Sequence, residues 1–317
     1  MRTMEGFRKE LGHIRRPVDG RIFALKLAVL CSLVAGGTAL VLSGTAWLMA
    51  FGIILLGLMY AHAIELQHEA LHGIGLRGSR GNVVAGVLLG IPMLISFAAY
   101  RSAHMRHHRL LGTPDNREFF DYGDQYGEGS GSRFRNAVVW VYRFSMIGHY
   151  ANFLAVCARL AAGRRLPDER PTAMRGIRRD HALLAGVLIA VVTASVVTGS
   201  MLAVWLWLLP LVVANPVHAL IELPEHYGCD TDTTDSLSNT RSIRSSKLMA
   251  WFTNGNNFHV EHHLMPSLPI AQLGELHVAL EGRHRFYHRT YREFFRWLLS
   301  GGTAGRPGPL LQPSESG

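Results

Sequence analysis

Four long apolar segments restrict the folds open to this chain. They cover residues 23–43, 46–66, 182–199 and 201–221, and Lys26 and Glu65 are the only Asp, Glu, Lys or Arg residues inside them. Each segment has about the 17 to 25 residues that an α-helix needs to cross a hydrocarbon core of roughly 30 Å. We therefore expect an all-α integral membrane protein with four transmembrane helices arranged in two hairpins.

The distribution of basic residues predicts an orientation for these hairpins. The two short turns that close them, residues 44–45 and 199–200, carry no charge, whereas Lys and Arg are frequent before residue 23, between residues 133 and 179, and after residue 221. Such residues accumulate on the cytoplasmic side of a membrane. We expect both termini and the histidine motifs on that side, and we read the net charge of +9 as suited to an anionic membrane surface, because no nucleic-acid-binding motif is present.

Two further apolar segments are interrupted and are not expected to span the membrane. Residues 83–100 contain Pro92, which breaks or kinks a helix, so we expect a re-entrant or interfacial segment there. Residues 137–162 mix apolar with basic residues, which favours an interfacial amphipathic helix. We assign residues 1–300 to a single membrane domain with a cytoplasmic helical cap, and residues 301–317, rich in Gly, Pro and Ser, to a disordered tail.

Histidines are concentrated in three short motifs. The first, "HEALH", matches the H-E-x-x-H pattern of zinc metalloproteases, in which Glu69 would act as general base. The second and third, "HMRHH" and "HVEHH", place histidines at intervals of three and four residues. Side chains at this spacing share one helix face, so each motif can direct two or three imidazoles at one point. The eight histidines are His68, His72, His104, His107, His108, His259, His262 and His263.

Eight imidazoles are more than one metal ion requires. A catalytic zinc takes three protein ligands and keeps one position open, so the protease hypothesis would leave most of these histidines without a function. Two metal ions with four or more nitrogens each would use all of them. Imidazole binds zinc, copper and iron, so the ligand type alone does not identify the metal.

The order and spacing of the motifs, H-x-x-x-H, H-x-x-H-H and H-x-x-H-H around paired membrane helices, resemble the membrane fatty acid desaturase and hydroxylase superfamily. The contexts "YRSAHMRHHRLLGTPD" and "NGNNFHVEHHLMPSLP" are similar as well, and the resemblance extends over about residues 23–273. It implies two iron ions (Fe²⁺) as cofactors, O₂ as co-substrate, and oxidation of an unactivated C–H bond in a lipid acyl chain, with no catalytic residues beyond the metal ligands.

The resemblance implies fatty acid desaturation, on an acyl-lipid, acyl-CoA or acyl-carrier substrate. Hydroxylases and ketolases that act on carotenoids or other lipids share all three spacings and remain the alternative, with the H-E-x-x-H membrane protease as a more distant one. No "HPGG" motif of a fused cytochrome b5 is present. We therefore expect a separate electron donor of the ferredoxin or cytochrome type.

Further candidate functional residues lie outside the motifs. Family members commonly supply one further metal ligand between the last membrane helix and the third motif, and His226 in "IELPEHYG" is the candidate. Glu222, one helical turn earlier, and Asn257 are candidates for orienting imidazoles or a bound water. Basic residues near the second and third motifs are candidates for holding an anionic head group, although topology alone also places basic residues there. These are Arg101, Arg106, Arg109, Arg241, Arg244 and Lys247.

Overall fold

The computed structural model describes residues 9, 11–14, 17–113, 115–116, 133–167 and 169–300. Within these ranges the chain is mostly helical, and four helices are long and apolar enough to cross a membrane. The predicted helical class and the four long apolar helices are thereby confirmed, while the predicted tail at 301–317 lies outside the described residues. The four are α2 (Gly20–Leu42), α3 (Ala46–Leu71), α8 (Pro171–Thr198) and the span Val204–His226, which joins the π-helical turn η2 (Val204–Leu208) to α9 (Leu209–His226).

Several of these helices extend beyond the apolar segments that predict them. α3 continues past residue 66 to Leu71, and α8 begins well before residue 182. A hydropathy pattern stops at the first polar residues, but a helix continues where those residues find partners. Gln67 Nε2 donates to Gly86 O at 2.8 Å, and the buried Asp180 carboxylate accepts from Ala98 N–H at 2.8 Å.

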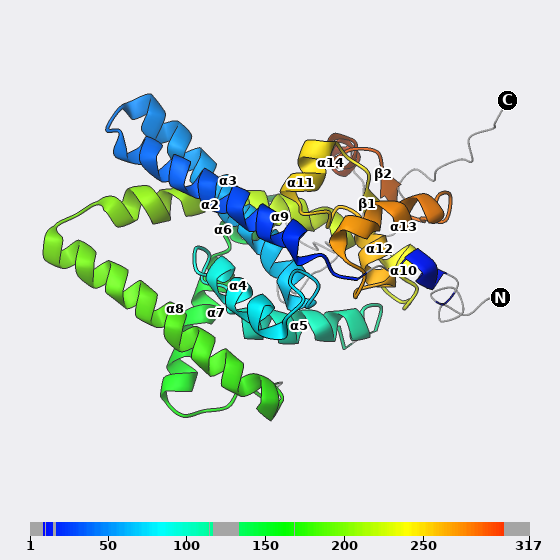
Figure 1. The fold of residues 1–317 in the computed structure, drawn as a ribbon, viewed down its shortest axis with the longest axis horizontal. Coiled ribbons are helices and arrows are strands. Elements are labelled where there is room, and N and C mark those ends of the chain that lie inside the picture. The colour runs from blue at the N-terminus through cyan, green and yellow to red at the C-terminus, as the bar shows by residue number, and fades with distance from the viewer. Residues whose placement is uncertain are drawn as a thin grey trace.

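The two predicted hairpins differ in their packing. α2 and α3 run antiparallel and pack side by side, and the other flank of α3 packs against α9. α8 and α9 instead diverge from the turn at residues 199–203 (Figure 1), and α8 packs against α5 (Phe97–Leu110) and α7 (Ile147–Ala161). α3 and α9 therefore form the centre of the molecule, and α8 forms one arm of an open V.

A close approach at Gly57 holds α3 against α9. A Cβ atom added there would lie 2.5 Å from Val213 Cβ and 2.7 Å from Pro210 O. Such overpacking costs about 1 to 3 kcal/mol. We therefore expect Gly57→Ala to lower the thermal unfolding temperature of the detergent-purified protein. The control is Gly36→Ala in α2, where an added Cβ meets nothing within 4 Å, and equal melting of the two variants would contradict this packing.

The segment predicted as re-entrant or interfacial consists of two helices and a turn. α4 (Ser79–Gly90) and α5 flank residues 91–96, where Pro92 lies and Leu94 adopts a left-handed φ of 56°. The 12 residues of α4 extend about 18 Å, too short to span a bilayer. The turn at Pro92 directs α5, which carries the second histidine motif, back toward α3.

The segment expected as one amphipathic helix at 137–162 is divided into α6 (Arg133–Ser145) and α7, with a break at Met146, whose φ is 53°. Contacts with α9 stabilise the break. Asn215 Nδ2 donates to Ser145 O at 2.9 Å, and Tyr150 OH donates to Asn215 Oδ1 at 2.8 Å. A single continuous helix would not place both groups on one asparagine, a tertiary requirement that periodicity does not reveal.

The C-terminal elements gather at one end of α3 and α9 (Figure 1). Buried leucines hold this cap together, among them Leu264, Leu273 and Leu276, which pack with Leu11 from the N-terminal region. A short parallel pair joins Ser242 with Tyr287 and Ile243 with His288. The elements are η1 (Leu11–Ile14), α10 (Ser236–Asn239), β1 (Ser242–Ile243), α11 (Lys247–Phe252), α12 (His259–Leu264), η3 (Ile270–Gln272), α13 (Leu273–Ala279), β2 (Tyr287–His288) and α14 (Tyr291–Leu299).

Candidate metal centre

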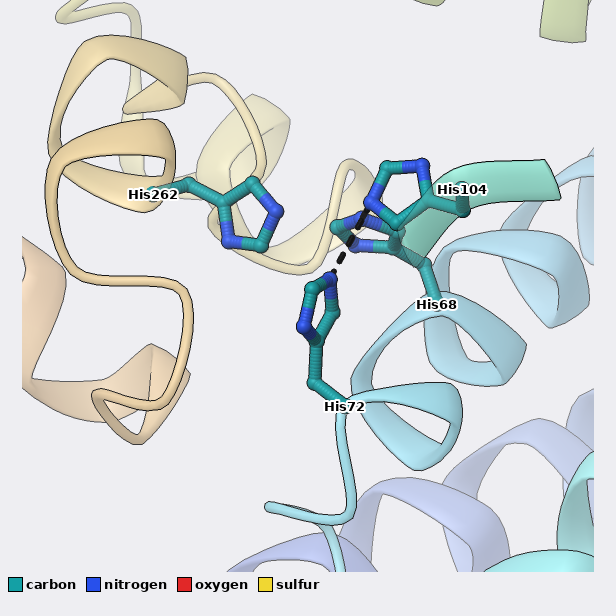
Figure 2. A group of neighbouring side chains, drawn as sticks. All are labelled: His68, His72, His104 and His262. Atoms are coloured by element: carbon teal, nitrogen blue, oxygen red, sulfur yellow. Dashed lines mark hydrogen bonds between the residues drawn. The ribbon is translucent and has the colours of Figure 1, made fainter. Parts of the chain in front are cut away.

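Four histidines from three different elements converge where the cap meets α3. His68 lies on α3, His72 directly follows it, His104 lies on α5 and His262 on α12. Each offers a ring nitrogen, and these nitrogens all lie within 4.8 Å of one another. Figure 2 shows the four rings pointing toward one region between the helices.

A second group of four lies beside the first. His107, His226, His259 and His263 are all buried, and their ligand nitrogens also lie within 4.8 Å of one another. His108 stands between the groups: its Nε2 lies 3.0 Å from His262 Nε2, and its ring centroid is 4.2 Å from that of His263. The structure therefore brings all nine predicted ligands together in one cluster.

The contacts among these rings are not those of an ordinary hydrogen-bond network. His104 Nε2 lies 2.8 Å from His68 Nε2, 3.1 Å from His72 Nε2 and 2.9 Å from His108 Nε2. A neutral imidazole has a single N–H, so one nitrogen cannot make three such hydrogen bonds at once. Imidazole binds zinc at about 2.0 to 2.1 Å, and two ligands at right angles would be about 3 Å apart. The nitrogen separations thus fit shared metal coordination.

The hydrogen-bond partners of the Nδ1 atoms also favour metal coordination through Nε2. His68 Nδ1 lies 3.0 Å from Asn256 Oδ1, His107 Nδ1 lies 3.2 Å from Asn116 Oδ1, and His226 Nδ1 lies 3.1 Å from the carbonyl oxygen of Asn239. An oxygen acceptor requires N–H at Nδ1, which leaves the Nε2 lone pair for a metal. The sequence analysis did not identify these three asparagines, although Asn256 lies in the "NGNN" stretch directly before the third motif.

The protonation states also suit metal binding. For six histidines of the cluster, burial is the largest cause that lowers the pKa, and neighbouring imidazoles lower it further. Neutral rings keep a lone pair to donate. The affected side chains, all with pKa well below 6.5, are His72, His104, His108, His259, His262 and His263.

Carboxylates within and beside the motifs have distinct environments. Glu69, the base of the protease hypothesis, is 2.9 Å from Lys26 Nζ and accepts from Asn254 Nδ2 at 2.9 Å. Glu69 is therefore part of the contact between α2, α3 and the cap.

Glu225 was not predicted from the sequence. Its Oε2 lies 3.3 Å from His259 Nε2 and faces the second group. Its position next to His226 is the one signal in the sequence that could have suggested it.

Glu261, inside the third motif, fixes α12 to the rest of the cap. Its Oε1 accepts from His277 Nδ1 at 2.5 Å and His284 Nε2 at 2.6 Å, and its Oε2 accepts from Ser242 Oγ at 2.5 Å. Burial alone would raise the pKa of Glu261, but the hydrogen bonds from His277 and His284 outweigh it and lower the pKa to about 2.

The depressed pKa predicts a loss of stability in acid. Because the Glu261 pKa falls from 4.5 to about 2 on folding, its contribution is complete above pH 4.5 and is lost as the pH falls toward 2. The shift corresponds to about 3 kcal/mol. We expect Glu261→Gln to remove this part of the pH dependence, measured as the difference in unfolding temperature between wild type and variant from pH 6 to pH 3. A difference that stays constant over this range would contradict the assignment.

The two residues predicted to orient imidazoles or water contact groups other than the nine clustered histidines. Glu222 Oε1 is 3.4 Å from His218 Nε2, beside the buried Glu65. Asn257 Nδ2 donates to Ile243 O at 2.7 Å and its Oδ1 accepts from Thr253 Oγ1 at 3.1 Å, so its amide holds β1 against the loop. The neighbouring residue Asn256 instead contacts an imidazole, that of His68. The two adjacent side chains thus have different partners.

The six basic residues proposed for head-group binding have different surroundings. Arg241 is 1% exposed: its Nη1 donates to Pro224 O and Tyr227 O, and its guanidinium lies over aromatic rings. This burial removes it from the surface where a head group would bind. Arg106 pairs with Glu169 at 3.6 Å, and both side chains line a cavity. The remaining four are exposed: Arg101, Arg109, Arg244 and Lys247.

The fold and the site together define a class: a membrane protein with a multi-histidine centre at the end of its spanning helices. The fatty acid desaturase family matches residues 45–295 of the chain. The chain therefore belongs to the fatty acid desaturase family, which confirms the resemblance in its motifs and identifies it as an integral membrane oxidoreductase. Among curated proteins, it is 24% identical to dihydrorhizobitoxine desaturase of Bradyrhizobium elkanii over 271 residues, covering 82% of this chain and 75% of the relative.

Proposed function

We propose that this protein is a desaturase that holds two ferrous ions on nine histidines and uses O₂ to oxidise an unactivated C–H bond of a membrane-borne chain. The proposal depends on one observation: nine histidine rings converge as two groups of four, with His108 between them. One ion would be held by His68, His72, His104 and His262, and the other by His107, His226, His259 and His263, with His108 between them.

When bound, iron supplies the activation of dioxygen that no amino-acid side chain provides. Desaturation removes two hydrogen atoms from neighbouring carbons and reduces O₂ to two water molecules, which requires two further electrons from a separate donor and two protons from solution. The protein binds the ions, orients their ligands through Asn256, Asn116 and the Asn239 carbonyl, and excludes water by burying the rings.

An apolar cavity of about 580 Å³ supports a membrane-borne substrate. It lies among α6, α7, α8 and the span from η2 to α9, where α8 and α9 diverge, and its lining includes Leu94, Leu188, Trp207 and Leu211. Apolar lining with few polar groups suits a hydrocarbon chain. Tyr150 and Asn215, hydrogen-bonded to each other, supply polar atoms in the lining.

A cavity of about 410 Å³ beside the second motif, with charged as well as apolar side chains in its lining, supports binding of an anionic head group, such as that of an acyl carrier or phospholipid. Arg106 and Arg159 line it together with Glu169. We expect Arg106→Glu to weaken the apparent substrate affinity, and an unchanged affinity would exclude Arg106 from this role. Arg101, Arg109, Arg244 and Lys247 are exposed and remain candidates for contact with an anionic group.

Family membership does not decide the compound that is oxidised. The relative is named for dihydrorhizobitoxine and not for a fatty acid. A fatty acyl chain remains our proposal because of the apolar cavity, with hydroxylation or ketolation of a carotenoid or other lipid as the alternative outcome at the same centre. We also propose that the histidines and both termini face the cytoplasm, where a ferredoxin or cytochrome can reach them.

The test combines metal analysis with lipid profiling. The purified protein is expected to contain about two iron ions per chain, and cells that express it are expected to accumulate an O₂-dependent unsaturated lipid product. A single zinc ion, with proteolytic activity lost in Glu69→Gln, would support the protease hypothesis instead. A hydroxylated or ketolated product would favour the alternative.

A further inference from the structure

The "NGNN" stretch before the third motif connects it to α3 through buried amides. Asn254 Nδ2 donates to Glu65 O at 3.1 Å and to Glu69 Oε2 at 2.9 Å. Asn254 and Gly255 both have left-handed φ values, 51° and 80°. Asn and Gly tolerate this conformation better than other residues do. The loop therefore turns sharply enough for the next residue, Asn256, to reach α3 as well.

Asn256 lies between an acidic residue and a metal ligand. Its Nδ2 donates to Glu65 Oε2 at 2.6 Å, and its Oδ1 lies 3.0 Å from His68 Nδ1. All three residues are buried, each 4% exposed. Glu65 and His68 lie three residues apart on α3, so they share one helix face, and Asn256 bridges them from the cap.

The chemistry of the three groups determines their order. An ionised carboxylate only accepts hydrogen bonds, so Glu65 must face the NH₂ side of the Asn256 amide. The amide oxygen then faces His68, which requires N–H at His68 Nδ1 and leaves its Nε2 lone pair directed at the first histidine group. The Glu65 carboxylate thus determines the tautomer of His68 through the amide of Asn256.

The position of Glu65 also requires an explanation. It lies in a membrane-spanning helix, where acidic residues are costly and usually functional. Its other oxygen, Oε1, lies 3.7 Å from His218 Nδ1 on α9, so the carboxylate is held from two sides. Its position is therefore fixed by α9 and by the cap together.

We propose that Glu65 and Asn256 are positioning residues that set the tautomer and orientation of His68, and so the metal affinity of the first histidine group. The inference rests on the proposed function, because it requires a metal at that group. Loss of such outer partners typically lowers metal affinity about 10- to 100-fold. We call the contacts from Glu65 through Asn256 to His68 the relay. The relay predicts a loss of affinity at only one of the two metal positions.

The test exchanges donor and acceptor within the relay. In Asn256→Asp the new carboxylate faces that of Glu65, and like charges at hydrogen-bond distance repel, so the aspartate cannot hold both neighbours. In the double variant Glu65→Gln with Asn256→Asp, the glutamine NH₂ donates to the aspartate, whose second oxygen accepts from His68. The total charge of the pair is the same as in the wild type. Glu65→Gln alone retains an oxygen that accepts from Asn256.

Full-length metal-free protein in detergent is titrated with Co²⁺, followed by its visible absorption bands. We expect two tight equivalents for the wild type, one position weakened about 10- to 100-fold with altered bands in Asn256→Asp, and recovery to within a few-fold in the double variant. Glu65→Gln alone is expected to lie within a few-fold of the wild type. Asn82→Asp is the control for lost stability, because the amide of the buried Asn82 hydrogen-bonds with backbone atoms of Leu76 and Gly78 at the start of α4.

The outcomes separate this inference from the proposed function. Wild-type protein that binds fewer than two cobalt ions would overturn both. Wild-type protein that binds two, with Asn256→Asp unchanged or with a double variant no better than Asn256→Asp, would overturn the relay alone. Thermal unfolding of each variant distinguishes misfolding, which Asn82→Asp also produces, from a specific loss at one metal position.

Discussion

Replacing His107 by alanine is expected to remove one of two metal ions and to reduce product formation to below about one-hundredth. His107 Nε2 lies 3.2 Å from His226 Nε2 and 3.3 Å from His263 Nε2, so its loss opens the centre of the second group. Removal of an outer partner already costs about 10- to 100-fold, and a direct ligand contributes more. Iron content per chain and O₂-dependent product, measured on the same preparation, check this expectation.

The counterpart in the first group is His262→Ala. It is expected to remove the other ion, so that each variant keeps about one metal per chain and neither forms product. His13→Ala is the control, since His13 is exposed on η1 and distant in sequence from every motif. Full metal content in both ligand variants would contradict the two-group assignment. A single zinc that survives both substitutions would contradict a di-iron centre altogether.

The sequence predicts which histidines meet in the structure because their spacing within each motif is local. Three and four residues separate the histidines of each motif, and a helix places such side chains on one face wherever it occurs. His226 was suggested by family resemblance, and the structure places its Nε2 3.0 Å from His259 Nε2. The candidate ligands are thus visible in the sequence as a pattern of one residue type.

The partners of these ligands could not be predicted in the same way. Asn256 and Asn257 are adjacent and identical in type, and only the left-handed turn at Asn254 and Gly255 decides which of them reaches His68. Helix ends were missed for a related reason: the apolar pattern ends at residue 66, but Gln67 has a partner in Gly86 and the helix continues. Both outcomes depend on tertiary contacts between distant segments.

Arg241 illustrates how charge alone misleads. A basic residue shortly before the third motif, on the predicted cytoplasmic side, suggests a surface site for an anionic group. The chain instead buries it among Phe286, Phe294 and Trp297, with its guanidinium carbon 4.9 Å from the centre of the Phe294 ring. Those aromatic residues lie between positions 286 and 297, far from Arg241 in the sequence, so their contact with Arg241 is a property of the folded cap.

Replacing Arg241 by alanine is therefore expected to destabilise the protein by about 3 to 5 kcal/mol. The variant leaves the carbonyl oxygens of Pro224 and Tyr227 without their donor, at about 1 to 3 kcal/mol for a buried group. It also leaves a cavity under the aromatic rings. Thermal unfolding in detergent measures the loss. Arg244→Ala is the matched control, because Arg244 is exposed three residues later and such changes usually stay within about 0.5 kcal/mol.

Arg241→Lys decides between a structural and a head-group role. Lysine keeps the positive charge, so a residue that attracts an anionic head group through its charge would tolerate the change. It lacks the planar fork of donors that reaches two carbonyl oxygens at 2.6 and 2.8 Å while stacking on rings. We therefore expect Arg241→Lys to lose most of the stability that Arg241→Ala loses, with substrate affinity unchanged in the folded fraction. Wild-type stability with weakened substrate affinity would instead return Arg241 to the substrate site.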